Sequence, residues 1–257
     1  MILDANAFIG KWPYWPVQAS SVHDLIAELG MVKIDAAAIC STRSVFVNWE
    51  DGNAEVEKAA KLQGSAVIPF ACLGTTELSH AFREPAYDFD GLQRRGFVGV
   101  RLYPQHHSYH PLFSGFVDVI LEDAASRGWP VVLPLRIIMN WGMPTVGPEV
   151  MHELVTRHPR VKWILAGVNY LHELQMATSL MLRYSNVCLE TSCVMGYAAI
   201  EKTACMCGSG QLLFGSGAPL QLATAGLAKI VQANLSDDAK EAILSGNLKR
   251  LLGGYIA

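Results

Sequence analysis

Short apolar segments alternate with longer segments of mixed polarity along the whole chain. In the longer segments apolar residues recur at i, i+3 and i+4, the spacing that places them on one face of a helix. The short segments are nearly continuous apolar runs, which is typical of strands buried on both faces. The predicted strands cover residues 2–6, 36–41, 66–73, 97–103, 130–135, 161–167, 186–192 and 211–216. The predicted helices between them cover residues 22–32, 53–63, 112–128, 147–158, 171–184, 197–206 and 220–234.

This alternation predicts an α/β fold in which helices cover a parallel sheet. The chain has 257 residues, and eight strand–helix units of this kind are typical of a (β/α)8 TIM barrel of about 250 residues. A doubly wound open sheet is the alternative. However, no predicted strand leads into the glycine-rich phosphate-binding loop that such sheets often carry. No linker or repeat interrupts the pattern, so we predict a single domain over residues 1–257.

The composition narrows the class of protein. Half of the chain is hydrophobic (51%) and 17% is charged, below the roughly 25% of an average domain, which favours a large core over disorder. The net charge is −3 and lysines and arginines do not cluster, so we expect no nucleic acid partner. No apolar run reaches the roughly 18 residues of a membrane span, and no signal peptide is visible. We therefore expect a cytoplasmic protein that does not bind membranes.

The cysteines do not predict a metal or disulfide framework. Their spacing fits neither a zinc site nor a redox motif. Most of them lie in apolar stretches, which suits reduced thiols buried as small hydrophobic side chains.

Polar residues that close the predicted strands are the first candidates for chemistry. In a TIM barrel, the active site lies where the strands end and the following loops begin. A polar side chain there needs a partner, which is either another such side chain or a ligand. These candidates are Asp4, Asn6, Arg43, Arg101, Tyr103, Arg136, Asn169, Glu190 and Ser216.

Five segments carry a family resemblance when they are taken in order. They are ILDANAFIG (2–10), GVRLYP (99–104), HPRVKWILAG (158–167), LLFGSGAP (212–219) and LSDDAKEAILSGNLKRLLG (235–253). They resemble the first, fourth and sixth strands, the closing Gly-Ser-Asp-x-Pro segment and the final helix of the amidohydrolase-related family. Members of this family are TIM-barrel hydrolases and decarboxylases of small organic molecules. The resemblance covers almost the whole chain and implies a TIM barrel that ends in a C-terminal helix.

The chain departs from this family at the metal ligands. The family's two first-strand histidines fall at Asn6 and Phe8, and its fifth-strand and sixth-strand histidines fall at Pro134 and Gly167. Its closing aspartate falls at Gly217. A catalytic zinc needs about three protein ligands from His, Asp, Glu or Cys, so we expect no metal and no other cofactor. Some family members, lactone hydrolases among them, work without a metal, so this loss does not exclude catalysis.

Four residues are candidates for proton transfer. His106 and His107 follow the fourth strand in RLYPQHHSYH (101–110), and histidine titrates near neutral pH. Asp4 and Glu190 supply carboxylates at strand ends. For each there is a structural alternative: solvated loop histidines, or buried carboxylates that only hold the fold together. A metal bound by His106, His107 and the nearby His110 is a further alternative.

A second group of residues is predicted to bind the substrate. Arg101 offers a planar set of donors that suits a carboxylate. Trp12 belongs to an aromatic stretch that could grip a planar ligand, cover the barrel end, or pack against a second copy in a homo-oligomer. The predicted substrate-binding residues are Asn6, Trp12, Arg101, Tyr103, Arg136, Asn140 and Asn169.

The preferred hypothesis is a metal-independent, amidohydrolase-like hydrolase of a small molecule. Arg101 and Arg136 favour an anionic, carboxylated substrate with a lactone, ester or amide bond. The alternatives are a catalytically silent barrel that binds a small ligand or a partner, and a decarboxylase-type lyase. A pocket where Arg101, a histidine and a carboxylate converge would favour an enzyme. A mouth filled by Trp12, Trp15 and Phe8 would favour the silent barrel.

Overall fold

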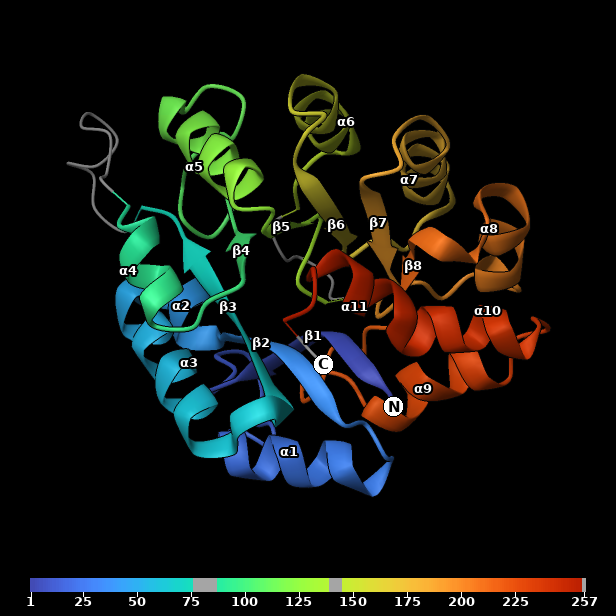
Figure 1. Cartoon of the computed structure of the whole chain (residues 1–257), viewed down its shortest axis with the longest axis horizontal. Helices are drawn as coiled ribbons and strands as arrows, with labels where there is room; N and C mark the ends of the chain where they lie inside the picture. Colours follow the sequence, from blue (N-terminus) through green and yellow to red (C-terminus); the bar gives the residue numbers. More distant parts are fainter. Residues whose placement is uncertain (76–86, 139–144, 256–257) are drawn as a thin grey trace.

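Eight parallel strands form the centre of the molecule, and each pairs with the next along the chain (Figure 1). The computed structural model describes residues 1–75, 87–138 and 145–255. The strands are β1 (Leu3–Ile9), β2 (Ala36–Ser41), β3 (Val67–Leu73), β4 (Gly99–Leu102), β5 (Pro130–Pro134), β6 (Lys162–Ala166), β7 (Val187–Glu190) and β8 (Leu212–Leu213). The predicted (β/α)8 TIM barrel is therefore confirmed, and the open sheet is excluded.

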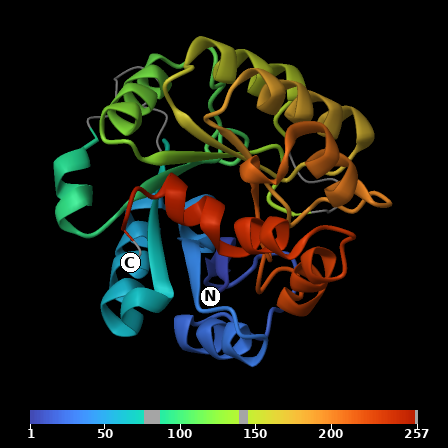
Figure 2. The ribbon, with the colours of Figure 1, turned by 45° about the vertical axis from the view of Figure 1, so that its right-hand side comes forward.

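Helices surround the strands on the outside of the ring (Figures 1 and 2). The α-helices are α1 (Val22–Met31), α2 (Thr42–Phe46), α3 (Trp49–Gln63), α4 (Phe89–Arg94), α5 (Gly115–Ser126), α6 (Pro148–Arg157), α7 (Leu171–Arg183), α8 (Ala199–Cys207), α9 (Ala223–Val231), α10 (Asp237–Glu241) and α11 (Asn247–Leu251). Short 3-10 helices η1 (Gly64–Ala66) and η3 (Ser209–Gln211) precede β3 and β8, and a π-helix, η4 (Ala242–Gly246), joins α10 to α11. Within the described residues, no helix has the length and apolarity that crossing a membrane requires.

Backbone hydrogen bonds between β1 and the segment after β8 close the ring. The Ala5 amide donates to the Phe214 carbonyl, and the Phe8 amide donates to the Ala218 carbonyl, both at 2.8 Å. In the other direction, the Gly217 amide donates to the carbonyl of Asn6 at 2.8 Å. First and last strands are thereby held in a fixed register, which brings residues 4–8 beside residues 214–218.

Local sequence signals set the helix boundaries. The Asn48 side chain caps α3 by accepting from the Asp51 amide, and α3 ends where Gly64 adopts a left-handed φ of 57°. The α2 and α4 helices were not predicted. α2 follows directly on β2, where the Ser41 side chain accepts from the Arg43 amide. Both helices are too short to show a helical hydrophobic period.

Buried apolar side chains form three layers. The largest lies between the strands and the outer helices. A second fills the lower barrel, where α11 contributes Leu248 and Leu251 against Leu3 and Ala36 at the strand starts. The predicted C-terminal helix therefore closes the N-terminal end of the barrel, and it crosses in front of the strands in Figure 2. The third layer lies at the opposite end, where the strands finish.

Candidate site at the barrel mouth

A chain of hydrogen bonds crosses the barrel where the strands end. Arg101 Nη1 on β4 donates to Asn6 Oδ1 on β1 at 2.7 Å. Asn6 Nδ2 donates to Ser192 Oγ at 3.3 Å, and Ser192 Oγ donates to Glu190 Oε1 on β7 at 2.8 Å. The same Glu190 oxygen accepts from the Gly167 amide, just after β6, at 3.3 Å. The guanidinium is thus connected to a buried carboxylate through two neutral groups. Asn6 and Arg101, both named as polar residues that close strands, are partners of each other.

Arg101 is a buried cation held mostly by neutral groups. Its exposed fraction is 0%. Besides Asn6, it donates through Nη2 to the Ala38 carbonyl at 2.7 Å. Its guanidinium lies over the rings of Phe8 and Phe70, at 5.3 and 5.7 Å from their centroids, within range of a cation–π attraction. Among the described residues, no carboxylate forms an ion pair with it. Arg101 therefore places positive charge in the middle of the barrel.

Asp4 is bonded separately and joins β1 to the loop after β8. Its Oδ1 accepts from the amides of Asn6 and Ser216, both at 2.9 Å, and its Oδ2 is hydrogen-bonded to Ser216 Oγ. Burial raises the pKa of Asp4 to about 7, although the bonds from Ser216 and Asn6 lower it and the nearby Glu190 raises it further. Within the described residues, Asp4 is hydrogen-bonded to Asn6 and Ser216 and not to Arg101.

The described residues do not fit the family's metal. The Phe8 ring lies against the Arg101 guanidinium. An apolar ring and a positively charged side chain therefore occupy positions where a metal ion would need ligands. The Asn6 amide oxygen is already an acceptor for Arg101. No group of three His, Cys, Asp or Glu side chains in the described parts of the chain is placed to hold a metal ion.

Two of the family's metal-ligand positions are glycines whose backbone conformation disfavours a return to histidine or aspartate. Gly167 and Gly217 adopt φ values of 69° and 71°, in the left-handed region that side-chain-bearing residues rarely adopt. A Cβ at Gly167 would lie 2.1 Å from the carbonyl oxygen of Arg136. A histidine at this position would therefore need a backbone shift, and not merely a free rotamer.

The two adjacent histidines differ in their surroundings. His107 is buried, and its Nε2 lies 2.9 Å from the Ser44 carbonyl oxygen. Because a carbonyl only accepts, Nε2 carries the proton, and burial lowers the pKa of His107. His106 is half-buried and packs edge-on against Phe46 and Tyr103, with ring centroids 5.2 and 6.3 Å away. Burial, and secondly the neighbouring His107, lower the pKa of His106 to about 4. Both imidazoles are therefore neutral at pH 7.

Apolar side chains cover the mouth above the Arg101 network. Phe8, Trp12 and Tyr103 form one cluster with Ile137 and Ile138, which follow β5. Trp12 is buried and makes ring contacts with Tyr14 and Trp15 at 5.5 and 5.4 Å. Trp15, in contrast, is exposed. Phe8 and Trp12 thus occupy the position expected for a filled mouth.

Several buried polar atoms in this region have no hydrogen-bond partner among the described residues. They are Trp12 Nε1, Ser44 Oγ, Arg101 Nε, His106 Nε2, His107 Nδ1 and Tyr109 Oη. Phe46 makes ring contacts with two of their side chains, with its ring centroid 5.1 Å from that of Trp12 and 5.2 Å from that of His106. Buried polar groups are nearly always paired, so such a group calls for an explanation.

Two other predicted substrate-binding residues, Arg136 and Asn169, are bonded to a different carboxylate, that of Glu173. Both terminal nitrogens of Arg136 donate to Glu173 on α7, and Nη1 also donates to the Gly167 carbonyl at 2.7 Å. The backbone amide of Asn169 donates to Glu173 Oε2 at 2.9 Å. Arg136 nevertheless lines a crevice of about 10 Å³ together with His106. Asn140 lies outside the described residues.

The predicted residues therefore fall into connected groups. Asn6, Arg101 and Glu190 share one network, and ring contacts link Tyr103 to both histidines. Their roles in binding or catalysis stay predictions.

Sequence reasoning missed two contributors to the mouth. Ser192 bridges Asn6 and Glu190, and its place two residues after the Glu190 strand end was the available signal. Cys40 is a buried free thiol on β2. Burial raises its pKa, but hydrogen bonding with Cys72 and the charge of Arg101 outweigh this, so the pKa of Cys40 is lowered.

Comparisons with known proteins agree with this fold. The amidohydrolase family model matches residues 50–254. No curated protein matches the sequence. An uncharacterized TIM-barrel protein from Bordetella bronchiseptica has a TM-score of 0.75 and 17% identity, covering 99% of both chains. The 5-carboxyvanillate decarboxylase of Sphingomonas paucimobilis has a TM-score of 0.72 and 14% identity, covering 98% of both chains. A probable 2-pyrone-4,6-dicarboxylic acid hydrolase from Acinetobacter baumannii, with citric acid bound, has a TM-score of 0.70 and 15% identity, covering 98% of this chain and 99% of the other.

Proposed function

This chain belongs to the amidohydrolase family, and we propose that it binds a small carboxylated molecule at the barrel mouth and cleaves it without the family's metal centre. Two structural relatives are named for carboxylated substrates, 5-carboxyvanillate and 2-pyrone-4,6-dicarboxylic acid. Likeness at this identity supports a shared fold, so the proposal rests on this chain's own residues.

The observation that carries the proposal is that two buried N–H donors, one in the apolar cover of the mouth and one beneath it, have no hydrogen-bond partner among the described residues. Trp12 Nε1 and Arg101 Nε are buried, lack a partner among the described residues, and can only donate. An unmade hydrogen bond at a buried donor costs about 1–3 kcal/mol. A carboxylate or carbonyl oxygen is the acceptor that would satisfy such donors, and these oxygens are what a carboxylated ester or lactone supplies.

The positive charge of Arg101 also favours an anionic ligand. Arg101 is bonded to the amide oxygen of Asn6 and to the backbone carbonyl of Ala38, and neither neutralises it. A buried cation is strongly destabilising unless it is paired. The nearest carboxylate in its network, Glu190, is reached only through Asn6 and Ser192, so a ligand carboxylate would give Arg101 the direct ion pair that it lacks. Since Asn6 fixes the guanidinium, the ligand would meet a donor group that is already oriented.

His106 is the described residue best suited to move a proton in this site. When water adds to an ester or lactone carbonyl, the water loses a proton and the departing alkoxide gains one. Neutral His106 has an unpartnered Nε2 that could accept the first proton and return it to the alkoxide. His107 suits this role less, because its Nε2 is bound to the Ser44 carbonyl.

The test is a set of carboxylated lactones, esters and aromatic acids, with 2-pyrone-4,6-dicarboxylate and 5-carboxyvanillate included. Binding is measured by thermal shift and calorimetry, and turnover by absorbance. His106→Asn should lower kcat/KM by about 100-fold or more, the usual scale for general acid–base catalysis. His110→Asn is the matched control, since His110 is an exposed histidine on the same loop. Equal losses in both variants would contradict a catalytic His106.

A catalytically silent barrel is the second candidate, and the apolar cluster over the mouth favours it. Phe8 and Trp12 are buried there with Ile137 and Ile138. If a carboxylate binds but none of the compounds is hydrolysed or decarboxylated, the silent barrel replaces the enzyme. If the mouth binds no anion at all, Arg101 is not a carboxylate-binding residue and the proposed hydrolase is wrong.

A further inference from the structure

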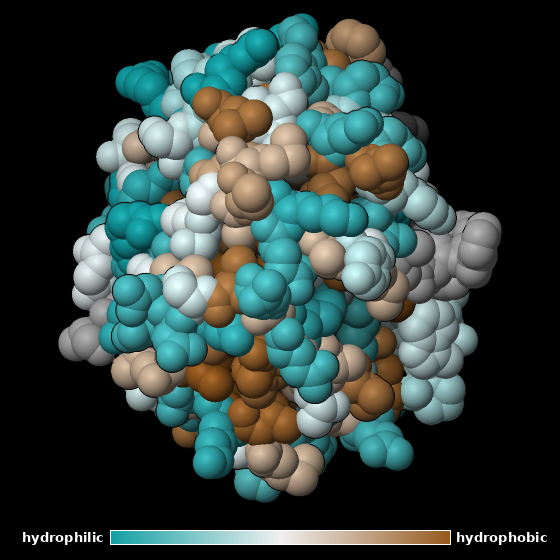
Figure 3. All heavy atoms as spheres, turned by 90° about the vertical axis from the view of Figure 1, so that its right-hand side faces the viewer, coloured by the Kyte–Doolittle hydropathy of each residue, from teal (hydrophilic) through white to brown (hydrophobic). Residues whose placement is uncertain are grey.

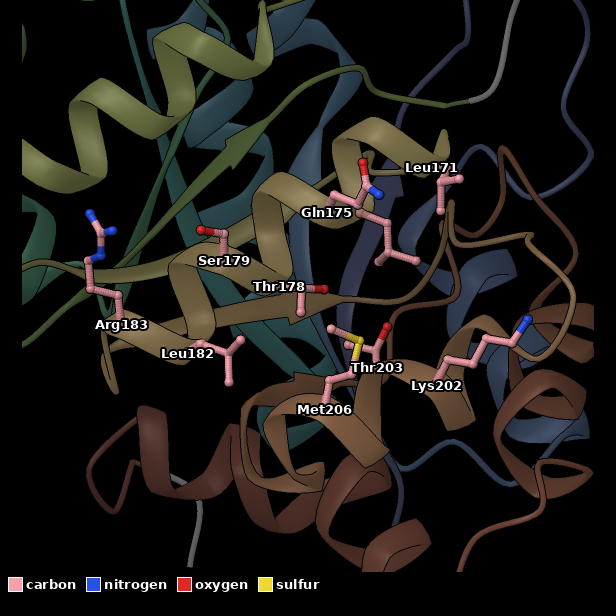
Figure 4. A pocket seen from close by; sticks show the side chains of 10 residues that line it. Leu171, Gln175, Thr178, Ser179, Leu182, Arg183, Lys202, Thr203 and Met206 are labelled. Atoms are coloured by element: carbon pink, nitrogen blue, oxygen red, sulfur yellow. The ribbon is translucent and has the colours of Figure 1, made fainter.

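A second surface feature lies on the outside of the barrel, away from the mouth network. Helices α7 and α8 pack side by side, and a groove of about 690 Å³ runs between them (Figure 4). Its lining residues are Leu171, Leu174, Gln175, Thr178, Ser179, Leu182, Arg183, Lys202, Thr203 and Met206. None of them belongs to the Arg101 network, so the groove is a separate site.

The groove has an apolar stripe along α7. Leu171, Leu174, Thr178 and Leu182 follow one another at spacings of three or four residues, which places them on one helical face. The stripe from Leu171 to Leu182 is about 17 Å long at 1.5 Å per residue. Leu171 and Leu182 are 72% and 61% exposed, and Met206 on the α8 wall is 61% exposed. Exposed apolar side chains gathered in one groove are a signature of an interaction site.

The charged residues that line the groove are both cationic. Figure 4 places Arg183 beside Leu182 at one end and Lys202 at the other. No acidic residue lines the groove. Neither cation takes part in an ion pair within the described residues, although Lys202 Nζ donates to the Tyr197 carbonyl at 3.0 Å. The groove therefore combines an apolar floor with positive charge at both ends.

From this arrangement we infer that the groove docks an amphipathic helix of a partner protein, with an apolar stripe bracketed by acidic residues. A third helix fits the furrow between two packed helices, and its apolar side chains at i, i+4, i+7 and i+11 would follow the α7 stripe. Acidic side chains near its two ends would meet Arg183 and Lys202. A second copy using the same groove would bring like charges together. Figure 3 shows this side of the molecule, on which small groups of hydrophobic residues lie among hydrophilic ones.

The experiment uses the full chain and a synthetic helix of about 15 residues, near the length at which isolated helices become marginally stable. The peptide carries leucine at i, i+4, i+7 and i+11 and glutamate in its first and last turns. A second peptide has lysine in place of each glutamate. Binding is followed by fluorescence anisotropy. The chain variants are Leu182→Asp and the double variant Arg183→Glu with Lys202→Glu.

The glutamate peptide should bind the wild-type chain, and Leu182→Asp should abolish binding. The double charge reversal should weaken it about tenfold, the scale of two surface ion pairs, and should strengthen binding of the lysine peptide. Leu62→Asp is the matched control, because Leu62 is a similarly exposed leucine (65%) at the end of α3, and it should change nothing.

Three results would overturn the inference. The first is no binding, or equal binding of the two peptides. The second is a dimer in sedimentation velocity that Leu182→Asp dissociates, which would assign the groove to a second copy. The third is displacement of the peptide by dodecanoate at a lower concentration than the unlabelled peptide requires, which would assign the groove to a small amphiphile.

Discussion

The variant Asp4→Asn should make the stability of the protein less dependent on pH. Burial raises the pKa of the Asp4 carboxyl from 3.8 to about 7. The folded chain therefore binds one more proton than the unfolded chain between these values, and the stability contributed by Asp4 falls as the pH rises through this range. The difference between a pKa of 3.8 and one of about 7 corresponds to about 4 kcal/mol. This contribution is fully present below pH 3.8 and is lost as the pH passes about 7.

The asparagine substitution leaves most of the hydrogen bonds in place. Its side-chain oxygen can still accept from the amides of Asn6 and Ser216, which Asp4 Oδ1 accepts at 2.9 Å, and its amide can donate to Ser216 Oγ. Asp4→Ala removes the acceptor for all three donors, at about 1–3 kcal/mol each. The alanine variant should therefore be unstable at every pH. The asparagine variant mimics the protonated carboxyl, so it should match wild type at low pH and exceed the stability of wild type near pH 8.

The assay is urea unfolding at pH 5 and pH 8, followed by tryptophan fluorescence. The difference in unfolding free energy between wild type and Asp4→Asn separates the titration of Asp4 from that of His106 and His107, which both proteins share. The lowered pKa of each histidine gives the opposite slope, with stability lost as the pH falls below 6.5. Asp238→Asn, at an exposed carboxylate, serves as the control. Parallel pH dependences for wild type and Asp4→Asn would refute a raised pKa at this position.

Two further predictions concern the mouth. The double variant Asn6→His with Phe8→His should bind zinc no better than wild type, because Arg101 still places a cation there; about one zinc per chain by elemental analysis after dialysis would contradict this. If the chain is a hydrolase, kcat/KM should rise with pH through about 4, because only the neutral form of His106 accepts a proton. An inflection of kcat/KM near pH 6.5 would assign the proton transfer to another group. An inflection near pH 4 that remains in His106→Asn but disappears in His110→Asn would do the same.

The fold could be predicted from the sequence because each strand lies in a nearly continuous apolar run. β2 was predicted over residues 36–41 and is observed as Ala36–Ser41. The last strand was predicted over residues 211–216 but is only Leu212–Leu213. The apolar run continues past it, yet the Phe214 amide donates to the Ile243 carbonyl in η4 and not to a neighbouring strand. Hydrophobicity marks the buried segment, whereas tertiary hydrogen bonds decide where the strand ends.

The site could be predicted only in part, because its partners are distant in sequence. Asn6 and Arg101 could be named as candidates because each closes a predicted strand, and strand ends meet at one mouth. The hydrogen bond from Asn6 to Ser192 joins residues 186 positions apart, and no local sequence pattern predicts it. Arg136 was expected to face a substrate, but Glu173, on a helix 37 residues away, occupies both of its terminal nitrogens. Only the packing of α7 against the barrel reveals that pair.

The indole N–H of Trp12 offers the most direct test of anion binding at the mouth. In a 15N–1H spectrum each tryptophan gives one indole signal, and Trp12→Phe identifies the one that matters. The indole of Trp163 is an internal control, because its Nε1 already donates to the His158 carbonyl at 3.2 Å. On titration with 2-pyrone-4,6-dicarboxylate or citrate, we predict a saturable downfield shift of the Trp12 signal while that of Trp163 stays in place. A Trp12 signal that stays fixed at millimolar ligand, or moves only together with that of Trp163, would contradict a carboxylate site at this mouth.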